Sequence, residues 1–520
     1  MLSGTARDRE RPASFRDVLV IGEFRAIYAA STLSWLGDYI ARAAITALVF
    51  QVTHNVVYTA AAFAISYVPW LLGGSVLVSL AERYPYRAVM VLCDVARMVL
   101  MAVVALPSLP LPVVLVLLFC SALFAPPFDA ARSAMLPSML PGDRYVVGLA
   151  LHTATVQPAQ VAGYFIGAAM ASGHPRLALL LNAGTFATSA ALTHFGVRLR
   201  PPALSRERRT HLLRETVDGF RVVFSSPALR FIVLIVFCGS VFAVVPEGLG
   251  AAWASQLADD SNRGWAQGVI MGAVPLGAIL GALMITSLVR PQTRQKLLRP
   301  LAVAIPLILV PAVFDPPVAI AALLAGLASF AMGALVPVAN GQFVRALPNA
   351  YRARAFGVVQ GGLQVLQGAA VVVTGTIAEH NARGVPVVVG LWGLAGVALM
   401  IILSLSWPAP KVFADAIAAA TASNAAEPPG YLPRHSVEPV AEDTTAAPPE
   451  PATLPEPAAA SDPTSPPEPV NQPEPAVDSM PETSRQRTAG LNGWGPAKGG
   501  PVTGAARRQA GSRQPGTIEP

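Results

Sequence analysis

The chain has 520 residues, of which 53% are hydrophobic and only 13% charged, and its mean hydropathy is +0.52. Soluble globular proteins usually have about 25% charged residues, and long chains divide into domains that each need a polar surface. This composition therefore excludes an ordinary soluble protein and indicates a lipid bilayer as the solvent. The formal charge of +7 does not indicate a nucleic-acid partner, because the arginines are spread over separate loops and form no continuous basic patch.

Long apolar segments recur along the chain. A spanning helix needs about 20 mostly apolar residues. This rule predicts an all-α membrane protein with twelve transmembrane helices, at about 24–47, 56–80, 87–107, 110–131, 144–171, 176–196, 229–254, 264–289, 299–314, 317–341, 353–379 and 385–407. Asp315 ends the ninth early. Prolines inside these segments (Pro69, Pro158, Pro246 and Pro275) are tolerated in a bundle and often mark kinks.

The predicted helices divide the chain into five parts. They are a polar segment at 1–22, a six-helix bundle at 23–197, a linker at 198–228, a second six-helix bundle at 229–408 and a tail at 409–520. The tail is rich in Pro, Ala and Glu, and it has too little apolar surface to offset the entropy lost on ordering, so we expect it to be disordered. It is either a solvated tail without an essential role or a docking segment for a cytoplasmic partner.

The loops predict the orientation, because Lys and Arg concentrate in cytoplasmic loops. Basic residues occur in the N-terminal segment, in the 198–228 linker and in three predicted loops, around Arg83 and Arg87, Arg290 to Arg299, and Arg345 to Arg354. The alternate loops are short and poor in cations. We therefore expect a multi-pass protein of the plasma membrane with both termini in the cytoplasm, its high isoelectric point arising from these topological anchors.

An internal repeat relates the two bundles. Gly74, Arg83 and Arg87 recur at one constant offset as Gly281, Arg290 and Arg294, and Gln157 and Gln160 recur at the same offset as Gln364 and Gln367. A third set, Pro126, Leu136 and Pro137, recurs as Pro337, Leu347 and Pro348. Each pair falls on corresponding helices of the two halves. Two repeats related by an axis along the membrane normal are a known transporter architecture.

The loop after the second predicted helix resembles that of the major facilitator superfamily. Many of its members carry Gly-x-Leu-Ala-Asp-Arg-x-Gly-Arg-Arg/Lys there, and Leu80, Ala81, Glu82, Arg83 and Arg87 stand in matching places. The stretches STLSWLGDYIARAAITALVFQVT and FAPPFDAARSAMLPSML are similar to the macrolide-efflux and siderophore-export branch of drug:proton antiporters. The resemblance implies the major facilitator fold and proton-coupled efflux of drug-like or amphipathic molecules by alternating access. Export of a siderophore or metabolite is one alternative, and a transport-inactive scaffold acting through its tail is another.

Charged residues inside predicted spans are costly and are therefore functional candidates. Asp38 lies near the middle of the first helix, with Arg42 four residues later on the same face. Either Asp38 couples transport to protons or the two residues form a static pair. Glu247 is expected near the external end of the seventh helix, where it attracts cationic substrates, gates the outer side or is a simple interfacial residue.

Two further groups of charges are predicted. Asp94 and Arg97, three residues apart, are expected to form a structural pair. By resemblance to the family, Glu82, Arg83 and Arg87 together with Asp129 and Arg132 form a cytoplasmic gate.

Polar and aromatic residues on apolar helices predict the wall of a substrate cavity: Trp35, Gln157, Gln160, Gln364 and Gln367. The glutamines either hydrogen-bond a substrate or join helices. The sequence has no glycine-rich phosphate loop followed by Lys-Ser/Thr, and its seven histidines lack metal-ligand spacing. We therefore expect a small-molecule substrate and protons as partners, no cofactor, no metal and no enzymatic activity.

Overall fold

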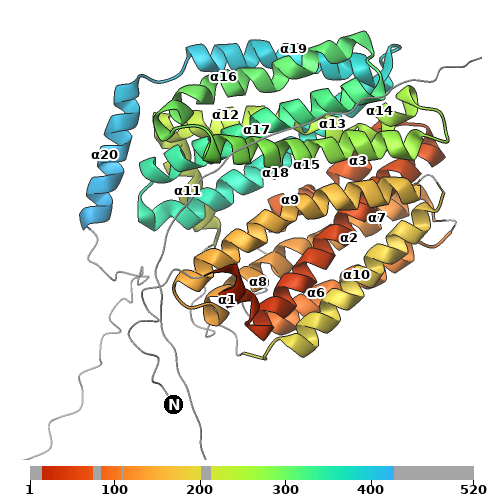
Figure 1. Ribbon diagram of the computed structural model, residues 1–520, viewed down its shortest axis with the longest axis horizontal. Helices are drawn as coiled ribbons and strands as arrows, with labels where there is room; N and C mark the ends of the chain where they lie inside the picture. The colour runs from red at the N-terminus through yellow and green to blue at the C-terminus, as the bar shows by residue number, and fades with distance from the viewer. Residues whose placement is uncertain (1–13, 74–83, 108, 172, 201–211, 427–520) are drawn as a thin grey trace, which may run out of the picture. The chain divides into compact units, whose positions relative to one another are not determined.

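A computed structural model describes residues 14–73, 84–107, 109–171, 173–200 and 212–426, and throughout these ranges every regular element is a helix (Figure 1). This follows from the bilayer, where a helix satisfies all of its backbone hydrogen bonds within one segment. Polar residues fix several helix ends. Ser14 caps the first short helix, Asn55 accepts a hydrogen bond from the Tyr58 amide, and His54 and Asp315 end their helices in the left-handed conformation.

The first half of the chain forms one helical bundle. Its elements are α1 (Phe15–Leu19), α2 (Gly22–Thr53), α3 (Val56–Ala64), α4 (Val68–Gly73), α6 (Tyr86–Val104), α7 (Leu111–Leu123), α8 (Ala125–Met139), α9 (Asp143–Ala171) and α10 (Pro175–Gly196). Helix α10 packs on both α2 and α6. The predicted fourth helix is two helices, α7 and α8, which meet at Phe124.

The second half forms a corresponding bundle after the linker helix α11 (Leu212–Ser225). Its elements are α12 (Pro227–Ala243), α13 (Val245–Gly248), α14 (Gly250–Leu257), α15 (Arg263–Ser287), α16 (Pro291–Leu309), η2 (Val310–Phe314), α17 (Val318–Ala346), η3 (Asn349–Tyr351), α18 (Arg352–Glu379), α19 (Gly384–Leu405) and α20 (Pro410–Ala426). The predicted seventh helix is thus interrupted on both sides of the short α13. Pro246, which cannot donate a backbone hydrogen bond, lies inside α13.

Two predicted boundaries are wrong. The basic residues between 290 and 299 were expected in a loop, but α16 begins at Pro291, so that most of them lie in its first turns. The tail was expected to be disordered from 409, but α20 covers Pro410–Ala426 and packs on α17 and α12. Its docking is stabilised by stacking of Trp407 on Phe413 and by a hydrogen bond from the Asn349 amide to Asn424 Oδ1.

The four prolines expected inside the spans differ in whether the helix is interrupted beside them. The chain leaves α-helical geometry just before Pro69, between α3 and α4, and beside Pro246. Helices α9 and α15 instead run through Pro158 and Pro275 without interruption. Neighbouring helices can supply partners for the carbonyl that a proline leaves free, so both outcomes are compatible with a bundle.

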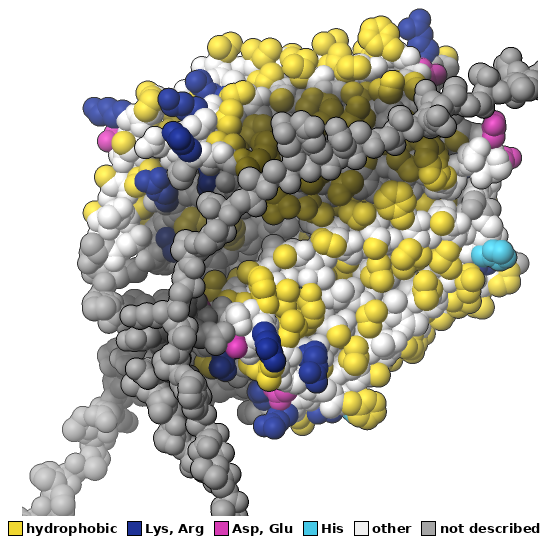
Figure 2. Space-filling view, viewed as in Figure 1, with side chains coloured by type: hydrophobic (Ala, Val, Ile, Leu, Met, Phe, Trp, Pro, Cys, Tyr) yellow, Lys and Arg dark blue, Asp and Glu magenta, His cyan; other side chains and the backbone are white. Residues whose placement is uncertain are grey.

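In the described part of the chain, eight helices are long and apolar enough to cross a membrane. Helices α6, α9 and α10 have comparable length but more polar residues, and α6 alone contains Arg87, Asp94 and Arg97. Large hydrophobic side chains are exposed along α10, α15, α17 and α19. Figure 2 shows hydrophobic side chains spread over the visible face. Exposed apolar surface on this scale marks contact with lipid.

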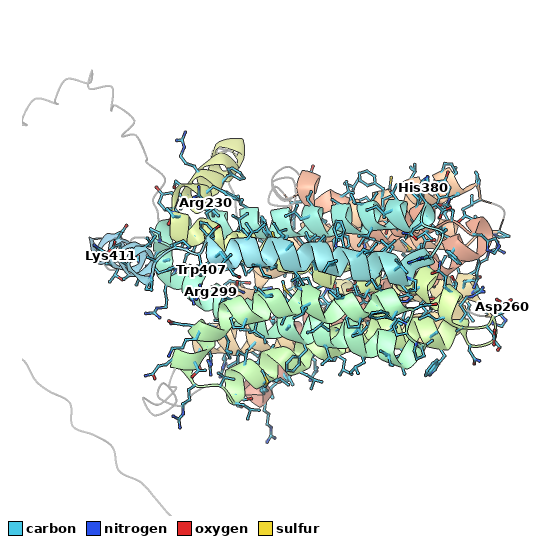
Figure 3. All side chains as sticks on the ribbon, turned by 90° about the horizontal axis from the view of Figure 1, so that it is seen from above. Arg230, Asp260, Arg299, His380, Trp407 and Lys411 are labelled. Atoms are coloured by element: carbon cyan, nitrogen blue, oxygen red, sulfur yellow. The ribbon has the colours of Figure 1, made fainter. Side chains whose placement is uncertain are left out.

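The two ends of the bundles differ in charge. Figure 3 shows Arg230, Arg299 and Lys411 at one end and Asp260 and His380 at the opposite end. This separation agrees with the alternation of basic and cation-poor loops in the sequence. The first end is called the basic end below, and the second the Asp260 end.

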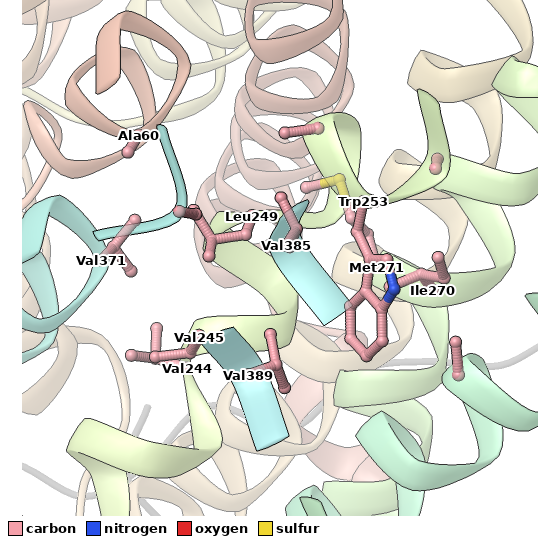
Figure 4. Packing of buried hydrophobic residues seen from close by; sticks show 14 of the residues in the cluster. Ala60, Val244, Val245, Leu249, Trp253, Ile270, Met271, Val371, Val385 and Val389 are labelled. Atoms are coloured by element: carbon pink, nitrogen blue, oxygen red, sulfur yellow. The ribbon is translucent and has the colours of Figure 1, made fainter. Parts of the chain in front are cut away.

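A buried apolar cluster joins the two halves toward the Asp260 end. Ala60 of α3 and Tyr164 of α9 belong to it, together with Leu249, Trp253 and Val371 from the second half (Figure 4). Trp253 is fully buried. Because this cluster takes side chains from both halves, the contact between the halves buries apolar surface.

Small residues set the spacing of α15 and α17. A Cβ atom added at Gly277 would lie less than 3.0 Å from the backbone of Gly326 in α17, and one at Gly281 would meet Phe330 in the same way. We expect Gly277→Ala to lower the free energy of unfolding by about 1–3 kcal/mol, the usual effect of overpacking a rigid contact. Thermal unfolding in detergent measures it. Gly184→Ala in α10, where nothing lies within 4 Å, is the matched control and should not be destabilised.

Candidate functional site

A cavity of about 380 Å³ lies between the two halves. The four glutamines of the repeat line it, Gln157 and Gln160 from α9 and Gln364 and Gln367 from α18. Corresponding helices of the two halves thus present the same residue type to one space. Arg42, Glu247 and Ser240 complete its polar wall.

A second cavity of about 230 Å³ adjoins the first, and apart from Gln364 its lining comes from the N-terminal half. Trp35, Asp38, Arg97 and Asp129 line it, and Tyr39, Arg42 and Gln364 border both cavities. Cavities of several hundred Å³ with a few convergent polar groups are typical of small-molecule sites. Each residue predicted for the cavity wall borders one of these two spaces.

Arg42 stands where the two cavities meet. Its guanidinium carbon lies 5.5 Å from the ring centre of Tyr39, 5.2 Å from that of Phe63 and 5.4 Å from that of Tyr67. Aromatic faces attract a cation, and in a water-poor site this attraction is worth about 2 kcal/mol or more. The rings therefore stabilise a charge that would otherwise be costly inside the membrane.

Glu247 lies across the contact from Arg42, on the short helix α13. Its Oε1 is 3.9 Å from Arg42 Nη1, and it accepts hydrogen bonds from Gln160 Nε2 at 3.1 Å and from the Tyr164 hydroxyl. Only 7% of Glu247 is exposed. The expectation of an interfacial residue at the external helix end is therefore wrong, because the break at Val244 turns this residue into the contact between the halves.

The predicted pair of Asp38 with Arg42 is also wrong. Both carboxylate oxygens of Asp38 accept from Arg97 Nη2 at 2.7 Å, and Arg97 Nη1 lies 3.4 Å from Ser34 Oγ. Arg97 stacks on Phe186 at 4.1 Å from the ring centre. Residues four apart on one helix are neighbours, but here the partner on α6 is better placed than the one on α2.

The expected pair of Asp94 with Arg97 is absent from the ion pairs of the described residues, because Arg97 is bound to Asp38. Asp94 is fully buried and accepts a hydrogen bond from Ser189 Oγ of α10 at 2.6 Å. Its other oxygen has no hydrogen-bond partner. Asp94 therefore lies one helical turn from Arg97 but forms no ion pair with it, because Arg97 is bound to Asp38.

The predicted gate residues are described only in part. Asp129 and Arg132 form an ion pair at 3.1 Å on α8, and the Arg132 guanidinium lies 5.2 Å from the Trp35 ring centre. The Nη2 atom of Arg87 lies 3.4 Å from His194 Nδ1. Glu82 and Arg83 lie outside the described residues.

Further contacts join the halves near the Asp260 end. Glu379, at the end of α18, accepts from Asn55 Nδ2 at 2.8 Å and from the Val56 amide at 2.6 Å. Its carboxylate thus caps the amino end of α3, where negative charge is favoured. Gln267 Nε2 also donates to the Ala43 carbonyl at 2.8 Å. The sequence analysis did not identify Glu379 as a contact residue. The available signal was an acid at the end of a predicted helix, since an acid can cap the amino end of a neighbouring helix.

The Glu379 contact predicts a change in access to the cavity. Hydrogen bonds to a charged group contribute about 1.5–3 kcal/mol each. The Glu379→Ala variant loses two of them, so the equilibrium constant for opening of the Asp260 end should rise roughly tenfold for each 1.4 kcal/mol lost. Faster labelling of a cysteine at Ser240, by an impermeant maleimide added from the Asp260 side in a background without native cysteines, measures it. Asp259→Ala, an exposed acid at the same end, is the control. Equal labelling of both variants would contradict a latch.

Comparisons with known proteins place these features in a wider group. Residues 27–247 match the family model of the Major Facilitator Superfamily. No curated protein sequence matches the chain significantly. Among solved structures, a point mutant of the nucleoside transporter NupG is similar with a TM-score of 0.61 at 13% identity, over 74% of this chain and 98% of that one.

Two structures of POT transporters are also similar. The peptide transporter POT in complex with sulfate gives a TM-score of 0.60 at 14% identity, over 78% of this chain and 97% of that one. A POT family transporter with 5-aminolevulinic acid gives 0.59 at 13% identity, over 75% and 96%. The chain is thus a multi-pass membrane protein with the major facilitator fold, and its similarity to transporters favours transport over an enzymatic reaction.

Proposed function

We propose that the chain is a secondary active transporter of the plasma membrane that exports drug-like or other amphipathic small molecules in exchange for protons. Export proceeds by alternating access, with the two halves rocking about the cavity between them. Both termini lie in the cytoplasm, so the basic end is the inner end and the Asp260 end the outer one. The gate at the inner end consists of Glu82, Arg83, Arg87, Asp129 and Arg132.

One observation carries the proposal: among the contacts between the halves, the one that borders the cavity is made by ionisable and polar groups. Glu247 of the second half meets Arg42, Gln160 and Tyr164 of the first. A proton taken up by Glu247 removes the charge that attracts Arg42, and the contact weakens as a result. Substrate entering the cavity competes for the same groups, which is the coupling that exchange requires.

The substrate binds where the two cavities adjoin. Trp35 and Tyr39 offer aromatic faces, while Gln157, Gln160, Gln364 and Gln367 offer amide donors and acceptors. This combination suits a molecule with an apolar body and a few polar groups. Asp38 stands at the wall of the smaller cavity with its carboxylate bound to Arg97, and it is the second proton-coupling candidate.

Substrate-dependent proton movement in inverted vesicles tests the proposal. A panel of amphipathic compounds is added to vesicles with an established pH gradient, and a compound that the protein exports dissipates the gradient. Vesicles without the protein are the control. If no compound moves protons but radiolabelled metabolites accumulate, proton coupling is rejected and transport is retained.

A metabolite or siderophore exporter is the second candidate, since the similar structures are of a nucleoside transporter and of a POT family transporter with 5-aminolevulinic acid. A siderophore in the compound panel distinguishes it. A scaffold acting through a partner of the tail is the third. Deleting residues 427–520 while keeping α20 leaves flux unchanged for a transporter and abolishes the effect of a scaffold.

A further inference from the structure

Asp94 is a buried acid that the proposed coupling does not use. It is fully buried in α6 and receives one hydrogen bond, from Ser189. Its Oδ1 has no partner, although buried carboxylate oxygens are normally paired because an unpaired charge in a water-poor site is very costly. The site accommodates a neutral carboxyl group far better than a carboxylate.

Arg97 has a buried donor that lacks an acceptor, just as Asp94 has a buried acceptor that lacks a donor. Its Nε is buried without a hydrogen-bond partner, while Nη2 is bound to Asp38. Asp94 and Arg97 lie three residues apart on α6, so their side chains are neighbours on one helix face. An exchange between the two acids therefore requires only that the Arg97 side chain turn toward Asp94 on the same helix.

Few other charged groups surround Asp94 and could compete with Arg97 for it. From α2 the group faces Asp38, and from α8 the Asp129–Arg132 pair, which is satisfied at 3.1 Å. Helix α10 contributes Ser189, Phe186 and Asn182, and Cys93 precedes Asp94 on α6. Asn182 is buried, borders the smaller cavity and has an amide nitrogen without a partner. It is a further polar group whose hydrogen bonds are incomplete in this arrangement.

We propose that Arg97 exchanges carboxyl partners, and that Asp38 and Asp94 share a single proton. In the arrangement described here, Asp38 is ionised and bound to Arg97, and Asp94 carries the proton. In the other arrangement, Asp38 facing the cavity carries the proton, and Asp94 is ionised and bound to Arg97. The number of protons and charges is the same in both arrangements. The exchange therefore moves one proton between Asp94 in the bundle interior and Asp38 at the cavity.

This inference rests on the proposed transport function, because it gives the cavity acid an internal proton store. Asp94 thereby becomes a positioning residue, which acts through Arg97 and not by contact with substrate. The exchange also explains why Arg97 is placed between two acids while binding only one. A single static pair would need no second buried carboxyl group one turn away.

Infrared spectroscopy of the full chain in lipid nanodiscs tests the exchange without any transport assay. The C=O stretch of a protonated buried carboxyl group should be present in the unmodified protein and absent in Asp94→Asn. Asp38→Asn frees Arg97 for Asp94, so this variant should also lose the band. Asp129→Asn is the matched control on the same cavity wall and should keep it.

A double variant shows whether the loss depends on the arginine. In Asp38→Asn/Arg97→Met no cation is left for Asp94, and the band should return. Arg97→Met alone should keep the band, which covers the case in which Asp38→Asn does not fold. The exchange is overturned if Asp94→Asn leaves the spectrum unchanged, or if Asp38→Asn retains the band. Band changes as expected in a protein that moves no substrate would instead reject the proposed function alone.

Discussion

Replacing Glu247 by Gln should uncouple transport from the pH gradient, if the proposed function is right. Glutamine keeps the size of the side chain and an acceptor for Gln160 and Tyr164, but it has no charge for Arg42 and takes up no proton. Allosteric coupling energies are typically about 1–3 kcal/mol, so we expect gradient-driven transport to fall about 5- to 150-fold. Exchange of labelled for unlabelled substrate across the membrane, which needs no net proton movement, should persist.

Proteoliposomes with and without an imposed pH gradient provide the measurement. Asp260→Asn is the control, because Asp260 lies at the Asp260 end with 89% of its side chain exposed. It should leave both driven transport and exchange unchanged. Retention of the full gradient dependence by Glu247→Gln would show that the coupling proton binds elsewhere.

Replacing Arg97 by Met should strongly destabilise the N-terminal half. It removes the only ion-pair partner that the structure shows for Asp38 and leaves two acids, Asp38 and Asp94, near one apolar side chain. Breaking a buried pair by removing one partner usually costs about 3–5 kcal/mol. We expect about 3 kcal/mol, the lower end, because 31% of the Asp38 side chain faces the cavity.

Thermal unfolding in detergent, followed by tryptophan fluorescence, gives the change in stability. The double variant Asp38→Asn/Arg97→Met should recover most of the loss, since removing both partners of a buried pair is often close to neutral. Arg230→Met is the control, because this arginine lies at the basic end away from the cluster (Figure 3). An equal loss in the single and double variants would mean that Arg97 stabilises the fold by packing on Phe186 alone.

The sequence predicted the part of the fold that depends on hydrophobic length and on the repeat. Each predicted span coincides with a helix or with consecutive helices, as far as the structure describes the chain. The glutamines of α9 and α18 were predicted as cavity residues because they are polar residues on apolar helices, and the structure brings them to one cavity. Repeats impose this result, because equivalent positions of two similar halves face a common axis.

The partners of the charges could not be predicted in this way. Spacing along one helix predicted Asp38 with Arg42 and Asp94 with Arg97, whereas the real partners come from other helices. Local spacing identifies neighbours on a helix surface but contains no information on which faces of different helices meet. The place of Glu247 was missed for a related reason, because a constant rise per residue assumes a continuous helix and α13 is separated from its neighbours by breaks.

The docking of the two terminal helices has a practical consequence. Helix α1 packs on α2 and α9 of the first bundle, and α20 packs on α12 and α17 of the second. Spin labels on α1 and α20 are therefore attached to different bundles, and neither helix contributes a residue to the two cavities. Their separation would report rocking of the bundles directly, during turnover, in a protein whose cavity residues are all intact.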